Sequence, residues 1–147
     1  MTTLRRRLRQ DSGSVSLEAI AGVSILIVLI GVVIGLARYS ASAGAVSQAA
    51  SEAAREASIN RNGGNAQSRA EATARRVLNN QGVECANLRV DVDTSGFSRA
   101  VGNRARVLVD VTCRVPYRDL SAVGILPGSS TITKTGESAI DRYRDRT

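Results

Sequence analysis

The chain has 147 residues and a net charge of +7, with 3% aromatic residues and neither His nor Trp. Without His, the commonest general base and metal ligand are missing, and two cysteines cannot by themselves complete a four-ligand zinc site. The basic residues alternate with acids and have few aromatic neighbours, so we expect no direct nucleic-acid binding. Composition favours a structural protein over an enzyme, with no catalytic residue, no metal and no cofactor.

The N-terminus combines a basic leader with a long apolar segment. Residues 1–13 carry four arginines against one acid, Asp11, and end in Gly13. Residues 19–37 carry no charge, and as a helix they would span roughly 28 Å, close to the hydrocarbon thickness of a bilayer. Arg38 follows at the far boundary. The excess of arginine before the segment predicts a single-pass membrane protein with a cytoplasmic N-terminus and an extracytoplasmic C-terminal domain.

The helix is expected to continue beyond the membrane. Residues 40–58 are rich in strong helix formers and contain no proline. Alanine recurs at every fourth position from Ala41 to Ala57, which gives a stripe of small residues that another helix can approach closely. The alternative is an Ala-rich helix without a special partner.

The remaining sequence predicts a second helix and β structure. A Gly-rich turn at residues 60–65 leads to a helix that Asn65 is expected to cap and that ends near Gln81. Alternation over residues 88–92 and 105–115 predicts two strands, and residues 130–139 a weaker third. In the long strand the inward candidates are Ala105, Val107, Val109, Val111, Cys113 and Val115, with Leu108 the exception among their outward neighbours. The fold class is therefore α+β: a long N-terminal transmembrane helix, then a small domain with one helix and about three antiparallel strands.

The junction between leader and apolar segment carries a second pattern. If the chain is cut after Gly13, Ser14 becomes the first residue, and Glu18 falls at the fifth position, immediately before the apolar run. A carboxylate at the edge of the hydrocarbon needs a positive partner, and the new α-amine of Ser14 would supply one. That pairing would set the axial register of one helix within a helical bundle.

These features resemble the TadE-like family of minor pilins and pseudopilins, from tight-adherence (Tad/Flp) type IV pilus systems. The shared features are the basic leader, the G-S-x-x-x-E junction, the apolar helix, Arg38, and A-x-x-x-A-R-x-A over residues 50–57. The sequence departs at Ala19, where an aromatic residue often follows the glutamate. The resemblance covers residues 12–58 specifically and the remainder in outline.

The resemblance implies that a membrane aspartic prepilin peptidase removes the leader at Gly13–Ser14. It implies a pilus or secretion filament with other pilin subunits, the pilus assembly platform and the lipid membrane as partners. The expected organisation is a leader at 1–13, a transmembrane and projecting helix at 14–58, and an exported domain at 59–147. One alternative is a single-pass membrane protein with an exported binding domain and no filament. Another is an ordinary signal peptide, because residues 41–43 form an A-x-A cleavage site.

Two further pairs of residues are candidates for structural roles. Gly31 and Gly35 form G-x-x-x-G, a spacing that lets two membrane helices pack closely, although it also occurs as mere local flexibility. Cys85 and Cys113 both follow the apolar segment and so share one compartment. In an exported domain such a pair predicts a disulfide, with two separate buried thiols as the alternative.

Overall fold

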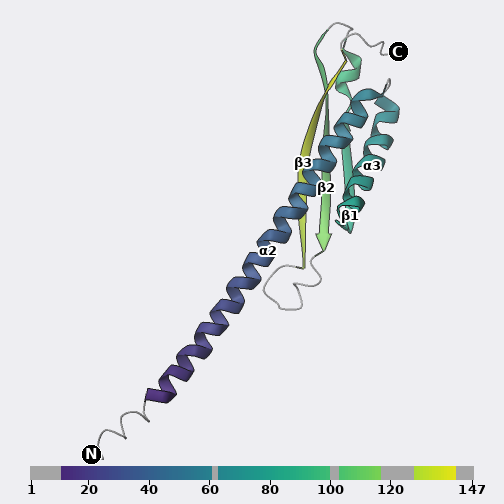
Figure 1. The fold of residues 1–147 in the computed structure, drawn as a ribbon. Helices are drawn as coiled ribbons and strands as arrows, with labels where there is room; N and C mark the ends of the chain where they lie inside the picture. Colours follow the sequence, from purple (N-terminus) through teal and green to yellow (C-terminus); the bar gives the residue numbers. More distant parts are fainter. Residues whose placement is uncertain (1–10, 61–62, 100–102, 117–127, 142–147) are drawn as a thin grey trace, which may run out of the picture. The chain divides into compact units, whose positions relative to one another are not determined.

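The computed structural model describes residues 11–60, 63–99, 103–116 and 128–141, with side chains from residue 19 onward. The chain divides into two compact units, Met1–Arg38 and Tyr39–Thr147. The first contains the N-terminal part of helix α2 (Asp11–Ile59), a 49-residue helix whose C-terminal part belongs to the second unit (Figure 1). The uninterrupted helix agrees with the predicted long N-terminal helix.

The second unit adds one helix and a three-stranded sheet. Helix α3 (Gly63–Asn80) is followed by β1 (Asn87–Asp93), the short 3-10 helix η1 (Ser95–Ser98), β2 (Ala105–Pro116) and β3 (Ser129–Ile140). The strands are antiparallel in the order β1-β2-β3, so β2 is central and the other two are edge strands. The predicted α+β fold is confirmed, and the three strands agree with their predicted ranges to within one residue.

Helix α3 begins earlier than predicted. Asn65 lies in its first turn instead of capping it, because the helix starts at Gly63. Glycine is tolerated there since the first N–H groups of a helix need no intrahelical partner. At the other end, Gly82 has φ of +68°, and Val83 N donates to Leu78 O at 3.0 Å. This is a Schellman ending, in which a glycine in the left-handed conformation follows the last turn of the helix.

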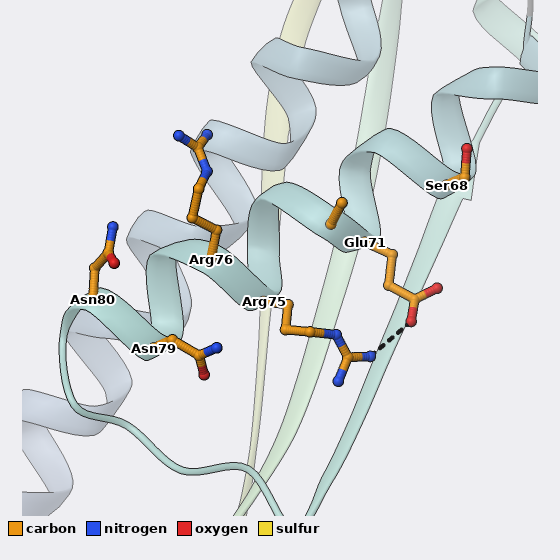
Figure 2. A pocket seen from close by; sticks show the side chains of 7 residues that line it. Ser68, Glu71, Arg75, Arg76, Asn79 and Asn80 are labelled. Carbon is orange, nitrogen blue, oxygen red and sulfur yellow. Dashed lines mark hydrogen bonds and ion pairs between the residues drawn. The ribbon is translucent and has the colours of Figure 1, made fainter.

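The solvent-facing side of α3 is polar. Glu71 and Arg75, one turn apart, form an ion pair at 2.9 Å, and Arg76, Asn79 and Asn80 extend from the same part of the helix (Figure 2). The opposite side carries Ala66, Ala70, Ala74 and Leu78, all buried. Helix α3 is therefore amphipathic, as expected for a helix that covers a sheet.

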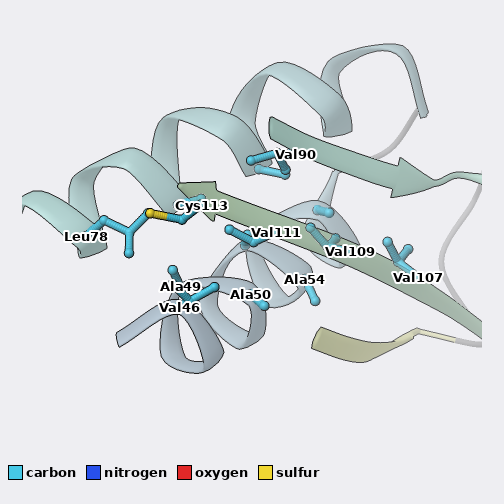
Figure 3. Packing of buried hydrophobic residues seen from close by; sticks show 14 of the residues in the cluster. Val46, Ala49, Ala50, Ala54, Leu78, Val90, Val107, Val109, Val111 and Cys113 are labelled. Atoms are coloured by element: carbon cyan, nitrogen blue, oxygen red, sulfur yellow. The ribbon is translucent and has the colours of Figure 1, made fainter. Parts of the chain in front are cut away.

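The core forms where α2 and α3 cover one face of the sheet. Every predicted inward residue of β2 is buried, and Leu108 is half-buried on the other side. Figure 3 shows Val46, Ala50 and Ala54 of α2 beside Val109 and Val111 of β2. The other face of the sheet is polar. Side-chain hydrogen bonds join β2 to β3 on this face, such as Arg106–Glu137 at 3.0 Å and Thr112–Thr133 at 3.0 Å.

Candidate functional site

The leader junction lies at the start of the described chain. The backbone of Gly13, Ser14 and Glu18 is helical within α2. The side chains of residues 11–18 lie outside those described, so the cleavage position and the pairing of Glu18 with the Ser14 amine stay predictions. What the structure adds is that this junction leads directly, with no break in the helix, into the apolar segment.

The apolar segment of α2 exposes its large side chains. Among the described residues, one helix near the N-terminus is long and apolar enough to cross a membrane, and none of its most apolar window is buried. Its large side chains are between 43% and 65% exposed: Ile20, Val23, Ile25, Leu26, Ile27, Val28, Leu29, Ile30, Val32, Val33, Ile34 and Leu36. Such a continuous apolar surface needs a lipid or protein environment to cover it.

Gly31 and Gly35 lie one turn apart on this segment, so they share one side of the helix. A Cβ built on Gly31 meets no described atom within 4 Å. The described chain therefore leaves this position open, and a helix from another molecule could approach the backbone here. The role of the pair in helix packing stays a prediction.

The alanine stripe farther along α2 is used within the chain. Ala45, Ala49, Ala53 and Ala57 are buried, whereas Ala41 is exposed. The stripe lies in the core of the second unit, and beside it Gly136 of β3 lies directly against the backbone of Ala50 and Ser51. A Cβ on Gly136 would overlap the backbone carbonyl of Ala50. Small residues on both elements allow this close approach, and Ser138 Oγ adds a hydrogen bond to Ser58 Oγ at 3.0 Å.

Cys85 and Cys113 form a disulfide with their Cα atoms 5.4 Å apart. Cys113 is fully buried in the middle of the sheet, and Cys85 lies in the connection between α3 and β1. The bond therefore fastens the end of the helical layer to the central strand. A disulfide of this kind suits an oxidising compartment.

The described part of the second unit has surface hollows, two of which stand out. One, of about 570 Å³, lies along the polar side of α3 shown in Figure 2. The other, of about 630 Å³, lies where η1 meets the ends of β2 and β3, beside Arg104, Arg106 and Glu137. No group of three or more metal-binding side chains occurs among the described residues.

Among the residues that the structure describes, two exposed ionisable groups have shifted pKa values. A hydrogen bond from the Ser95 backbone N–H to Asp93 Oδ1, at 2.9 Å, lowers the pKa of that carboxyl. The hydrogen bond from Arg89 Nε to Asp91 Oδ2, at 2.7 Å, raises the pKa of the guanidinium. Hydrogen bonds to the charged form account for both shifts. They belong to the solvated surface of the sheet and of the turn after β1.

Comparison of the chain with known proteins finds no matching family model, no similar curated protein and no similar solved structure. The function of the chain is therefore inferred from its residues and from the geometry of α2.

Proposed function

We propose that this chain is a structural subunit, a minor pilin or pseudopilin, that takes part in assembling a tight-adherence pilus or a related secretion filament. The observation that carries the proposal is the order of features along one helix. The G-S-x-x-x-E junction leads into an uncovered apolar segment, and the same helix then becomes a buried element of an α+β domain. A subunit that leaves the membrane for a filament needs all three features.

Each part of α2 has a role in this proposal. Prepilin peptidase cuts after Gly13 on the cytoplasmic side, and Glu18 then pairs with a Ser14 amine to set the register. The apolar segment lies in the membrane before assembly and packs against other pilin subunits after it, with Gly31 and Gly35 at close helix contacts. The C-terminal domain is carried outside, where its disulfide forms.

Leader removal separates this proposal from its alternatives. Wild-type protein from the membrane fraction is expected to begin at Ser14 by N-terminal sequencing, lighter by thirteen residues. Gly13→Val is expected to block the cut and to leave the full-length chain in the membrane, because a side chain there obstructs the peptidase. Gly22→Val is the matched control, since a Cβ on Gly22 meets no described atom within 4 Å.

Two other outcomes would reject the proposal. An uncut chain in the wild type favours a single-pass membrane protein with an exported binding domain and no filament. A mature start at Gly44, directly after the A-x-A site, favours a signal peptide and a secreted product. That second cut would also remove Ser42, which is buried in the second unit, and Ala43, which packs against its core.

A further inference from the structure

The outer edge of strand β1 is occupied by a side chain from helix α3. Gln67 Nε2 donates to Val90 O at 2.6 Å, and the backbone N–H of Val92 donates to Gln67 Oε1 at 3.1 Å. Because the sheet order is β1-β2-β3, these two backbone groups belong to an edge strand. Edge strands present unpaired N–H and C=O groups to which another chain can add a strand.

The two bonds reproduce those of a neighbouring strand. The Val90 carbonyl and the Val92 N–H flank Asp91 along β1. In a parallel pair of strands, one residue of the adjacent strand would donate its N–H to the Val90 carbonyl. The carbonyl of that same residue would accept a hydrogen bond from the Val92 N–H. The side-chain amide of glutamine carries the same donor and acceptor as a peptide unit. Gln67 therefore takes the place of one residue of a fourth strand.

We propose that Gln67 closes the β1 edge against strand addition by a second copy of this chain. When the amide is absent, the freed groups of β1 face the identical groups of another β1, and the two strands can pair about a two-fold axis. The inference concerns the sheet alone, so it holds whether or not the protein assembles into a filament.

The opposite edge explains why a dimer, and not a longer assembly, is the expected product. Alternation along β3 places Lys134 on the helix-covered face, between buried Ile132 and Gly136. The Lys134 side chain is nevertheless exposed. It is the only lysine in the chain. An inward-facing charge on an edge strand resists the addition of another strand. With the β3 edge still closed, only the pairing of β1 with β1 remains, and that pairing is complete at two copies.

The test replaces Gln67 with methionine in the full chain, held in detergent micelles. Methionine is similar in length and suits a helix, but it offers neither the donor nor the strong acceptor of the amide. The matched control is Gln81→Met, which removes a different long-range glutamine bond, Gln81 Nε2 to Gln48 Oε1 at 2.6 Å. That bond joins the end of α3 to α2 and involves no residue of the sheet.

Two measurements on each variant decide the matter. At dilution, hydrogen exchange of the Val92 amide is expected to be at least about tenfold faster in Gln67→Met than in wild type, because its acceptor is gone. At high concentration, light scattering is expected to show dimers beyond the wild-type level. Gln81→Met is expected to match wild type in both. Should Gln67→Met fail to fold, Gln67→Asn, whose amide falls one methylene short, is measured in its place.

A second change identifies the surface that the dimer uses. Val92→Pro, added to Gln67→Met, removes the freed N–H from the edge and is expected to return association to the wild-type level. Dimers that persist in the double variant overturn the proposal, because they use another surface. Unchanged Val92 exchange in Gln67→Met also overturns it, and so does faster exchange without association, which would mean that Gln67 only fastens α3 to the sheet.

Discussion

Helix α2 has two parts with opposite surfaces. In residues 19–38 the large aliphatic side chains are exposed, and in residues 42–58 small side chains are buried. Both parts are helical and both carry apolar side chains, although the second also carries Glu52, Arg55 and Glu56. Helicity therefore does not separate them. Side-chain size does: Ile, Leu and Val dominate the exposed part, whereas Ala and Ser dominate the buried part.

The difference reflects what each part must contact. Lipid tails adapt to bulky side chains, and a bilayer needs a long and strongly apolar surface to hold a helix. A sheet of the same chain is rigid, and a helix can approach its backbone only where both surfaces are small. Ala50 against Gly136 is such an approach, since a Cβ on Gly136 would overlap the Ala50 carbonyl. Two environments are therefore encoded by residue size on one helix.

The largest expected effect concerns the covalent tie of the buried part. Cys85→Ala/Cys113→Ala removes a bond that closes a separation of 28 residues, for which chain entropy suggests about 3–4 kcal/mol. We expect the free energy of unfolding to fall by that amount, measured by far-UV circular dichroism in denaturant, while membrane association stays unchanged. In denatured, unreduced wild-type protein from the cell surface, thiol labelling should find no free thiol. Two free thiols per chain would contradict the bond and weaken the exported assignment.

A smaller effect is expected from a charge in the exposed part. Leu29→Arg places a guanidinium near the middle of the apolar segment, which costs about 2.5–3.5 kcal/mol in membrane insertion. The fraction of chain inserted, measured with a glycosylation reporter fused to the C-terminus, should therefore fall. The control is Ser51→Arg, which places a guanidinium at an exposed position in the other part of α2 and should leave insertion at the wild-type level. Equal effects at the two positions would remove the distinction between the parts.

Much of this division could be predicted from the sequence, because it depends on local patterns. Three local patterns each predict their structure from a few neighbouring residues: the alternation in β2, the uncharged run in α2 and the glycine that follows α3. The partner of the alanine stripe could not be predicted in this way. A stripe of small residues fits another helix or a strand equally well, and only the long-range fold buries it in the core of the second unit, next to the contact of Ala50 with Gly136. Gly136 was the available signal, since an isolated glycine in a strand often marks close approach of another backbone.

Gln67 shows a stricter limit of sequence reasoning. It is one of several polar residues on the outer part of an amphipathic helix, and nothing in its neighbours distinguishes it. Its role depends on the distance between α3 and the edge of β1, which the sheet order sets. Asn65 shows the converse case, because a local capping signal was present but the helix began two residues earlier.

The smallest expected effect comes from one methyl group placed in each part of the chain. Gly136→Ala puts a Cβ where the Ala50 backbone lies, and a helix backbone cannot rotate away as a flexible side chain can. We expect the free energy of unfolding to fall by about 1–3 kcal/mol, as in other overpacked cores, although alanine favours a strand no less than glycine does.

Gly31→Ala adds the same methyl group to open space on α2, so the unfolding of the second unit should be unchanged. In the membrane, however, that methyl group would hold a neighbouring helix farther from the backbone, so Gly31→Ala should weaken helix–helix association if Gly31 and Gly35 form a contact. Chemical denaturation and cross-linking of the two variants together therefore test whether tight backbone approach serves the chain's own sheet at one glycine and a second molecule at the other. A stability loss in Gly31→Ala equal to that in Gly136→Ala would show that the two parts of α2 do not differ in this way.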